Sequence, residues 1–350
     1  MLNRKTFLTY LLQKNIKRPK ITNRSKTRVL IVTYDAIGDM VMTIPLINAI
    51  HKKQPNWQLE LLSSPRSFPL IQYHPALQHI WSLDINRPFG KLDNKGKKQL
   101  KILYKQEFDI LIYLGERISS ATLWRLSNIT AIERLSLPFT EKKCRHKGID
   151  PLQSRLFDRY IGLSNEEETH FCHRMLSILP DLQITPSTEI DLSLYLPKTN
   201  LPNIPFPSGN RHVLFNPTGS QDGNTLAFNQ VNEIIPKLTK LSLSIFMFDT
   251  TENRKIVNDN QEIYWLPSAN ILVAAQWLTK MDLTLTTDTS IGHISVAQSR
   301  PTIIMRSNEQ WRDCCDPISK NVQMLRAESE DIKSLSSDLI IQAVKQKLNL

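Results

Sequence analysis

Residues 281–305, MDLTLTTDTSIGHISVAQSRPTIIM, carry the clearest structural signal in this chain. The Leu- and Thr-rich run Leu283–Thr287 predicts a strand. Asp288–Ser290 consists of residue types that favour turns and helix N-caps, and the apolar residues that follow repeat at helical spacing. Pro301 ends this helix, and Thr302–Met305 predicts a second strand. The stretch therefore predicts a strand–helix–strand unit of an α/β domain.

The turn between the first of these strands and the helix is a candidate anion site. In an α/β domain, a helix that follows a strand presents its first N–H groups at the carboxyl end of that strand, where such folds bind phosphates. His293 lies near the end of the first helical turn and would reach a bound anion. The alternative is that Asp288 only caps the helix and that His293 is a surface histidine. Taken by itself, the stretch favours this alternative.

A second strand–turn–helix signal lies near the N-terminus, in residues 28–45, RVLIVTYDAIGDMVMTIP. Its apolar start predicts a buried parallel strand, and a helix is expected over about residues 40–53, starting late or kinked because of Pro45. Gly38 permits close approach of a ligand to the backbone. Asp39 is expected at the carboxyl end of the strand and the N-terminus of the helix, where the helix dipole stabilises a carboxylate. The alternative is that Asp39 only caps this helix.

Together the two stretches resemble glycosyltransferase family 9, the bacterial lipopolysaccharide heptosyltransferases. Ile37-Gly38-Asp39 is similar to the Gly-Asp pair that precedes a helix in that family. Residues 288–293, DTSIGH, are similar to its nucleotide-binding turn, Asp-Thr/Ser-Ser/Gly-x-x-His. The resemblance runs from about Arg28 to about Ile318. It implies the α/β fold called GT-B, in which two Rossmann-like domains with parallel sheets face one another across a cleft.

The resemblance also implies a reaction, glycosyl transfer with inversion. Asp39 would be the general base that deprotonates the acceptor hydroxyl. The backbone N–H groups of Thr289 and Ser290, the helix dipole and His293 would hold the departing diphosphate. Asp288 would orient the turn or contact the sugar. The family's usual donor is ADP-L-glycero-D-manno-heptose, and its usual acceptor is the Kdo or heptose of the lipopolysaccharide inner core.

No cofactor or metal is expected. Neither half has G-x-G-x-x-G after its first strand, which argues against a nicotinamide or flavin enzyme. No D-x-D pair occurs in a suitable loop, which is in keeping with a metal-independent mechanism. In the second half, Glu252 is a candidate for contacts with the ribose hydroxyls.

One loop departs from the family. After the strand expected at residues 212–216, relatives commonly carry a Lys or Arg that binds the nucleotide diphosphate. Here the equivalent position is Gly223, Asn224 or Thr225, and none of these is basic. A missing cation beside a diphosphate weakens the stabilisation of the leaving group. Ser220 and the loop amides would still bond to phosphate oxygens, and the arginines at positions 306 and 312 are alternative sources of the cation.

A chain of 350 residues is long enough for two domains of ordinary size. The second half opens after the Pro- and Asn-rich residues 197–210, which read as a linker. Helical segments are expected within residues 150–180, a strand at 191–196 and an amphipathic helix in the tail. The expected divisions are a basic arm (1–27), an acceptor domain (28–196), the linker (197–210), a nucleotide-sugar domain (211–327) and a C-terminal helix that packs back on the body (328–350).

The net charge of +11 at pH 7 has three competing explanations: nucleic acid, an anionic membrane surface and an acidic substrate. The chain shows no recognised nucleic-acid motif, and its basic residues are spread out. A transferase that acts on phosphorylated lipid A–core acceptor at the inner membrane would use basic residues both for the anionic membrane surface and for the acidic substrate. Candidate contacts to acceptor phosphates or carboxylates are Arg66, Arg117, Arg125, Lys142 and Lys143.

A cytoplasmic protein is expected, either free or at the cytoplasmic face of the inner membrane. No apolar run approaches the roughly 20 residues of a membrane span. Charges interrupt the N-terminus, MLNRKTFLTYLLQKNIKRPK, as they would not in a signal peptide. This arm could lie on the membrane as an amphipathic helix or pack on the protein.

Two other functions remain open. One is a relative that transfers another sugar in surface-glycan assembly. The other is a degenerate family member that binds sugar nucleotide or glycan without turnover, which the missing basic residue favours. The presence of Asp39 and of the complete turn at residues 288–293 argues against this second possibility.

Overall fold

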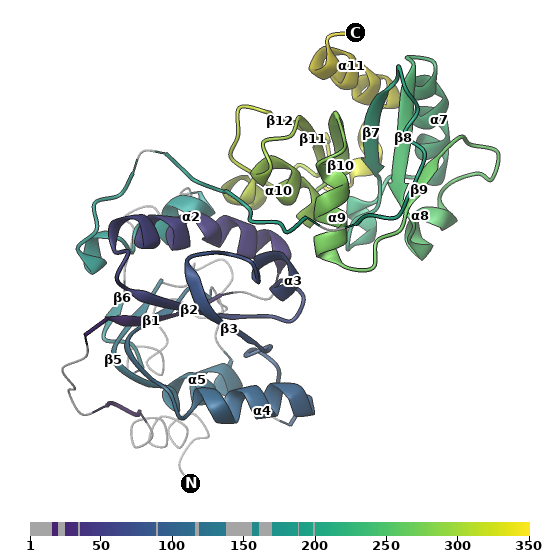
Figure 1. The fold of residues 1–350 in the computed structure, drawn as a ribbon. Coiled ribbons are helices and arrows are strands. Elements are labelled where there is room, and N and C mark those ends of the chain that lie inside the picture. The colour runs from purple at the N-terminus through teal and green to yellow at the C-terminus, as the bar shows by residue number, and fades with distance from the viewer. Residues whose placement is uncertain are drawn as a thin grey trace. The chain divides into compact units, whose positions relative to one another are not determined.

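The computed structural model describes residues 16–19, 25–33, 36–88, 90–115, 119–137, 156–160, 170–187, 189–198 and 200–350. The chain divides into two compact units between Asp191 and Leu192 (Figure 1). Unit 1 is the N-terminal unit and unit 2 is the C-terminal unit. Each consists of a parallel sheet with helices packed against it.

Unit 1 contains a six-stranded parallel sheet in the order β3-β2-β1-β4-β5-β6. Its central strand β1 lies between β2 and β4, with Val29 opposite Leu59 on one side and Ile110 on the other. This strand is apolar on both faces because helices cover both, as in other parallel sheets. The strands are β1 (Arg28–Val32), β2 (Gln58–Ser63), β3 (Leu77–Ser82), β4 (Glu107–Tyr113), β5 (Thr130–Ser136) and β6 (Arg159–Tyr160).

The helix after β1 begins earlier than predicted. Helix α2 spans Ile37–Lys53 and continues through Pro45. Gly38 and Asp39 therefore belong to its first turn, at the carboxyl end of the central strand. The other helices of unit 1 are α3 (Phe68–Ile71), α4 (Asn94–Leu103), α5 (Ser120–Ser127), α6 (Phe171–Leu176) and the 3-10 turn η1 (Pro180–Leu182).

Unit 2 repeats this topology in a six-stranded parallel sheet of order β12-β11-β10-β7-β8-β9. Numbered from its own first strand, each sheet has the order 3-2-1-4-5-6, which is that of a doubly wound Rossmann-like fold. The strands are β7 (Arg211–Asn216), β8 (Leu243–Phe248), β9 (Tyr264–Leu266), β10 (Leu283–Thr287), β11 (Thr302–Arg306) and β12 (Val322–Arg326).

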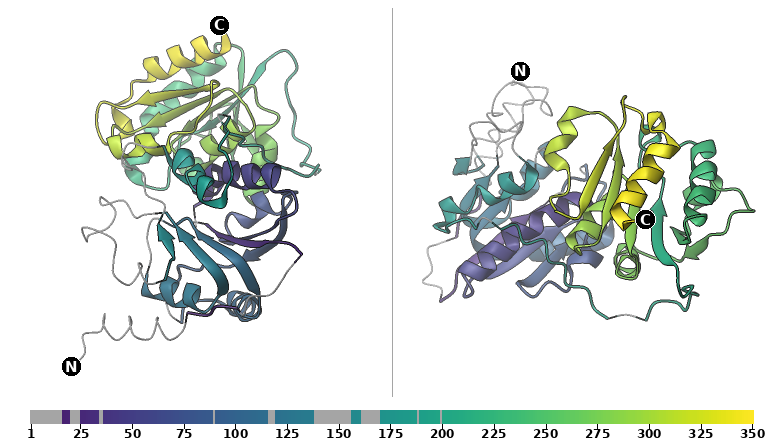
Figure 2. Two further views of the ribbon diagram at one scale, coloured as in Figure 1. Left: turned by 90° about the vertical axis from the view of Figure 1, so that its left-hand side faces the viewer. Right: turned by 90° about the horizontal axis from the view of Figure 1, so that it is seen from above.

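The helices of unit 2 include α7 and α11, which lie side by side (Figure 2). Their apolar residues, among them Ile234, Leu238, Ile340 and Val344, share one core with β7 and β8. The helical elements are α7 (Phe228–Thr239), α8 (Thr251–Lys255), α9 (Ile271–Leu278), α10 (Ser290–Ala297), α11 (Ser337–Leu348), η2 (Asp222–Asn224), η3 (Gln310–Cys315) and η4 (Ile332–Ser334).

Three local predictions were wrong. Residues 159–160 form the edge strand β6 instead of lying in a helix, because they pair with Leu135 and Ser136 of β5. Residues 191–196 alternate in polarity but pair with neither sheet. They connect the two units, and side-chain amides bond to the carbonyls of Asp191 and Pro197. In the tail, residues 328–350, the α-helix is confined to Ser337–Leu348. Before the tail, residues 322–326 add the edge strand β12, which was not predicted.

Part of the N-terminal arm packs on unit 1. The N–H of Lys17 donates to the carbonyl of Ser127 (3.2 Å), and the N–H of Ala131 donates to the carbonyl of Lys17 (3.3 Å). Arg18 pairs with Asp158. The apolar residues 7–12, on which the membrane alternative rests, lie outside the described residues. No helix in the described part of the chain combines the length and apolar character needed to cross a bilayer.

Candidate functional site

The site predicted at residues 288–293 follows β10, the strand at which the strand order of the unit 2 sheet switches from one side of β7 to the other. From β7 the chain continues to β8 and β9 on one side, and it then returns to place β10 on the other side of β7. Thr286 of β10 lies opposite Asn216, the last residue of β7. In open α/β sheets, ligands bind at the carboxyl ends of the strands that flank such a switch point.

A polar network ties the two strands to Thr289, the N-cap residue of α10. Asn216 Nδ2 donates to Thr286 Oγ1 at 3.0 Å and to Thr289 Oγ1 at 3.3 Å. The hydroxyls of Thr286 and Thr289 lie 3.2 Å apart. Thr289 is the N-cap of α10, yet its side chain makes no capping hydrogen bond to the helix. Its hydroxyl thus fixes the turn to the sheet, and it does not occupy the first N–H groups of α10.

The glycine of the motif has a packing role. A Cβ on Gly292 would lie 2.8 Å from Ile304 Cδ1, so glycine allows α10 to approach β11 closely. Ser295 reinforces this approach, with its Oγ 2.8 Å from the hydroxyls of Thr284 and of Thr302. Helix α10 is therefore held against both strands beneath it.

His293 is buried in this packing, with 8% of its surface exposed. The alternative of a surface histidine was therefore wrong. Asp288 is half-buried and is not the cap of the helix, since that position belongs to Thr289. The Asp288 N–H donates to the carbonyl of Met305 at 3.0 Å, which fixes the turn to β11.

An ion-pair cluster stands next to this turn. Arg306, at the end of β11, is ion-paired with Asp313 and lies 3.2 Å from Asp316. Arg326 pairs with the same two carboxylates, at 3.3 and 3.4 Å. Burial, and to a smaller extent the charges of Asp313 and Asp288, raise the pKa of Asp316 to about 6, although the two arginines oppose the shift.

Arg306 cannot supply the cation that the loop after β7 lacks. Its side chain is 1% exposed and enclosed by two carboxylates. The idea that Arg306 replaces the missing basic residue was therefore wrong. The side chain of Arg312, the other alternative, lies outside the described residues.

The loop after β7, residues 217–225, is tightly folded. The Gly219 N–H donates to Thr225 Oγ1 at 3.0 Å, and a Cβ on Gly219 would lie 2.4 Å from the Asn224 carbonyl oxygen. Thr218 Oγ1 donates to the buried Asn253 of α8 at 2.9 Å. Among the predicted donor-binding residues, Ser220 is exposed on this loop and Asn224 is buried.

Glu252, the last predicted donor contact, is exposed in the first turn of α8. This helix follows β8, the neighbour of β7, so Glu252 lies at the same edge of the sheet as the turn after β10. Sequence reasoning missed Asn216. The available signal was its position as a polar residue at the end of an apolar strand, directly before Pro217.

Unit 1 presents Asp39 at the equivalent edge of its own sheet. Ala36 is the N-cap of α2, so Asp39 is a first-turn residue rather than the cap. It is half-buried, and its carbonyl accepts a hydrogen bond from Thr43 Oγ1 at 2.9 Å. Gly38 precedes it in the same turn. A carboxylate in this position is stabilised by the positive end of the helix dipole.

A pocket of about 740 Å³ opens at the carboxyl ends of β2 and β3. Of the predicted acceptor contacts, Arg66 lines it. Arg117, Lys142 and Lys143 lie outside the described residues. Sequence reasoning missed three further basic residues, although each lies in a segment that follows a strand. The charged lining residues are Arg66, Arg87, Lys91, Lys95, Asp84 and Asp93.

Arg125, another predicted acceptor contact, does not line this pocket but supports the segment that forms its wall. Its buried guanidinium donates to the carbonyls of Ile85 (2.5 Å), Arg87 and Pro88 (3.2 Å). Burial lowers the pKa of Arg125. Thr122 adds a bond to Asn86 at 2.9 Å. The segment after β3 is thereby fixed to α5.

Residues 97–343 match the sequence model of glycosyltransferase family 9 (heptosyltransferase). The chain belongs to glycosyltransferase family 9. This confirms the resemblance and makes the protein a glycosyltransferase. No curated protein matches the chain closely enough to count as a relative.

Solved structures similar to this transferase show its fold. E. coli heptosyltransferase WaaC with ADP-2-deoxy-2-fluoro heptose is 18% identical with a TM-score of 0.72, over 91% of this chain and 99% of that one. The family 9 transferase of Veillonella parvula is 12% identical with a TM-score of 0.74, over 92% and 97%. E. coli ADP-heptose LPS heptosyltransferase II is 14% identical with a TM-score of 0.70, over 92% and 99%. The predicted GT-B fold is confirmed.

Proposed function

We propose that this transferase moves heptose from ADP-heptose, with inversion, to the inner core of lipopolysaccharide or lipo-oligosaccharide at the cytoplasmic face of the inner membrane. The observation that carries the proposal is the Asn216–Thr286–Thr289 network. It holds residues 288–293, which resemble the family's nucleotide-binding turn, at the switch point of unit 2. Family membership and the ADP-ligand complexes solved for WaaC support the choice of donor.

Unit 2 is the proposed nucleotide-sugar unit. The first N–H groups of α10, at Thr289 and Ser290, bind the diphosphate together with the positive end of the helix dipole. His293 and Asp288 complete the turn, and Ser220, Asn224 and Glu252 are the proposed contacts from the neighbouring segments. Backbone donors that are already fixed stabilise the charge that develops on the leaving diphosphate without further rearrangement.

Unit 1 is the proposed acceptor unit, and Asp39 is its base. As the acceptor oxygen forms its bond to the anomeric carbon, the bond from that carbon to the diphosphate oxygen breaks. The electron pair of the broken bond stays on the diphosphate, and the hydroxyl proton passes to the Asp39 carboxylate. Attack from the face opposite the leaving group inverts the anomeric centre. No metal ion takes part in this proposed sequence.

The acceptor's anionic groups bind in the pocket of unit 1. Its lining carries four basic side chains and two carboxylates, which gives an excess of positive charge. Phosphates and carboxylates on a lipid A–core acceptor match this charge, and arginines such as Arg66 and Arg87 bind such groups through paired N–H donors. The remaining basic surface of the chain supports contact with an anionic membrane.

A thermal-shift titration with ADP, UDP and GDP tests the donor. A nucleotide that binds only the native state raises the melting temperature by mass action. We expect ADP to stabilise the protein more than UDP or GDP at equal concentration, and ADP-heptose to be consumed when acceptor is present. A shift with UDP or GDP alone would overturn the choice of donor.

A second candidate, a family member that binds sugar nucleotide without turnover, is favoured by one observation. No Lys or Arg occurs in residues 217–225, where relatives commonly carry a basic residue. Turnover of ADP-heptose with lipid A–core acceptor would exclude this candidate. Binding of ADP-heptose without release of ADP would support it, and a transferase for another sugar would release nucleotide only from a different donor.

A further inference from the structure

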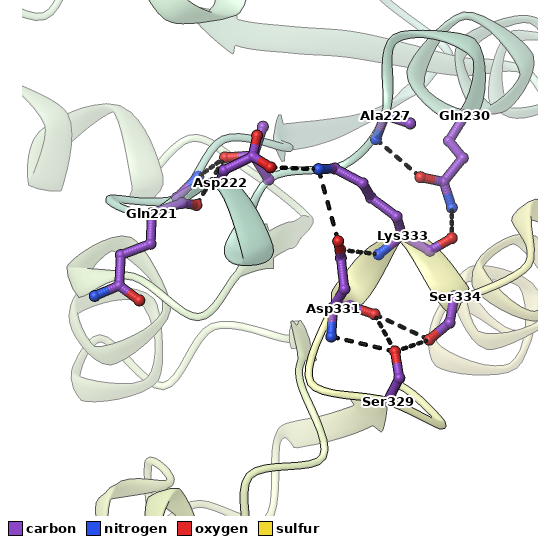
Figure 3. Close-up of polar contacts among 10 residues, drawn as sticks. Gln221, Asp222, Ala227, Gln230, Ser329, Asp331, Lys333 and Ser334 are labelled. Carbon is purple, nitrogen blue, oxygen red and sulfur yellow. Dashed lines mark hydrogen bonds and ion pairs between the residues drawn. The ribbon is translucent and has the colours of Figure 1, made fainter.

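Lys333 is distant in sequence from the loop that lacks a basic residue, but its side chain contacts that loop. Its Nζ lies 2.7 Å from Asp222 Oδ2 and 3.7 Å from Asp331 Oδ2 (Figure 3). Asp222 opens the short helix η2 and directly precedes Gly223 and Asn224. These are positions at which the family's cation was expected. A lysine on η4 thus brings positive charge to the loop by a tertiary contact.

The backbone around Lys333 is firmly held. Gln230 of α7 donates to the carbonyl of Lys333 at 2.9 Å, while its Oε1 accepts from the Ala227 N–H at 2.8 Å (Figure 3). Gln230 also donates to the carbonyl of Leu335 at 2.7 Å. Ile332 and Leu335 are buried in the core of unit 2. The flexible part of Lys333 is therefore its side chain alone, projecting from a fixed point beside the loop.

The loop after β7 begins beside the proposed nucleotide-binding turn, residues 288–293. Asn216, directly before the loop, bonds to Thr289 at the N-cap of α10. Adjacent strands such as β7 and β10 are only about 4.8 Å apart. Asp222 lies six residues beyond Asn216 in a loop that folds back on itself through the Gly219–Thr225 bond. A charge at Asp222 consequently stands at the same sheet edge as the proposed diphosphate site.

We propose that Lys333 supplies the cation for the diphosphate of the nucleotide sugar, in place of the basic residue that the loop after β7 lacks. This inference rests on the proposed donor site. The Asp222 side chain is 89% exposed and that of Lys333 is 33% exposed. Ion pairs this exposed contribute little, so the ammonium group can leave Asp222 for a phosphate at small cost. Lysine suits this role because its charge is compact and its four-carbon stem is flexible.

Binding of ADP and of AMP to Lys333→Met, measured by calorimetry, tests the assignment. We expect the affinity for ADP to fall about tenfold or more, as for loss of a charge-assisted contact, and the affinity for AMP to change much less. Lys333→Arg, which keeps the charge, should restore most of the ADP affinity. Lys237→Met is the matched control, because Lys237 also pairs with carboxylates on the surface of unit 2, those of Glu233 and Asp338.

Asp222→Asn distinguishes diphosphate binding by Lys333 from a purely structural role of the Lys333–Asp222 ion pair. If Lys333 binds the diphosphate, removing its competing partner should leave ADP affinity unchanged or increase it. If the pair only holds the loop closed, Asp222→Asn and Lys333→Met should weaken ADP binding equally, which would overturn the inference. ADP binding by Lys333→Met at wild-type strength would overturn it as well and leave the donor site standing. Absence of nucleotide binding by the wild-type protein would overturn both proposals.

Discussion

The two sheets of this transferase have the same strand order but present different chemistry at their carboxyl edges. In unit 1, a helix with a carboxylate in its first turn follows the first strand, and a basic pocket lies beyond the second and third strands. In unit 2, the proposed anion site follows the fourth strand of the sheet, and the loop after the first strand has no cation of its own. Shared topology fixes where a site can form, and the side chains at each edge decide what it can bind.

Each unit also buries an arginine beside its candidate site, with different partners. Arg125 is satisfied by backbone carbonyls and keeps a wall of the basic pocket in place. Arg306 is ion-paired with the carboxylates of Asp313 and Asp316. Neither guanidinium is available to a substrate, so the basic groups proposed to meet ligands are exposed or half-buried side chains. The buried arginines stabilise the sheet edges, and the more accessible basic groups are the ones proposed to bind ligands.

The largest expected effect is a loss of turnover in unit 1 without a loss of nucleotide binding in unit 2. Asp39→Asn removes the proposed base while keeping the size of the side chain. We expect kcat to fall by about 10³-fold, in the range of general-base catalysis, and the Kd for ADP to change less than twofold. Steady-state turnover and calorimetry measure the two quantities.

Asp338→Asn provides a matched control for this result. Asp338 is likewise a carboxylate in the first turn of a helix, α11 of unit 2, and it belongs to neither candidate site. Its loss should cost a little stability without a comparable fall in kcat. Equal falls in kcat for the two variants would remove the base assignment from Asp39.

The sequence reveals the candidate turns because both are local. Runs such as Leu283–Thr287 and the residues around Val29 identify central strands by composition, and the polar residues that follow mark the edge. Burial of His293 and the contact between Lys333 and Asp222 depend on tertiary packing and have no local signature. Composition alone could not assign Arg125, whose partners lie about 40 positions earlier in the chain.

The edge strands β6 and β12 escaped prediction for a related reason. Strand β12, VQMLR, has a mixed pattern because it has a single neighbour, β11, and is only partly covered. Residues 191–196 alternate like a strand but belong to neither sheet. Strand formation depends on such a partner, which a single segment does not reveal.

A smaller effect is expected from the wall of the basic pocket. Arg125→Met removes a buried guanidinium from three carbonyls, at a cost of about 2–3 kcal/mol in the free energy of unfolding. The segment after β3 should loosen, so the KM for the acceptor should rise while the Kd for ADP stays the same. Urea unfolding and the two binding measurements check this. An unchanged acceptor KM would mean that the pocket is not the acceptor site.

Unit 2 should show the converse pattern with Gly292→Ala. The new Cβ would contact Ile304 Cδ1, and such overpacking costs about 1 kcal/mol, partly offset by the better helix propensity of alanine. Displacement of α10 should weaken ADP binding and leave acceptor KM unchanged. The double variant Gly292→Ala with Ile304→Val removes the clashing methyl and should recover both stability and ADP affinity. Lack of recovery would show that the glycine serves the ligand and not the packing.

The smallest effect on activity is expected from the Arg306–Asp313–Asp316 cluster of unit 2, where the change appears only as a pH dependence of stability. Burial raises the pKa of Asp316 from 3.8 to about 6, so the folded protein holds this proton more tightly than the unfolded chain. Stability from this group is therefore greatest at low pH, and it declines as the pH rises from about 4 to about 6. Asp316→Asn cannot titrate and lacks this decline.

The free energy of unfolding of Asp316→Asn should thus increase relative to wild type between pH 4 and pH 6 and then remain level. Urea midpoints at pH 4, 5, 6 and 7 measure the difference, in which the other titrating groups cancel. The opposite slope would mean that attraction to Arg306 and Arg326 outweighs burial. In that case the carboxylate would stabilise the ion-pair cluster in its charged form. The buried charges of the Arg306–Asp313–Asp316 cluster in unit 2 would then stabilise one another, as the carbonyl groups stabilise Arg125 in unit 1. The two sheet edges would in that case differ only in their exposed residues.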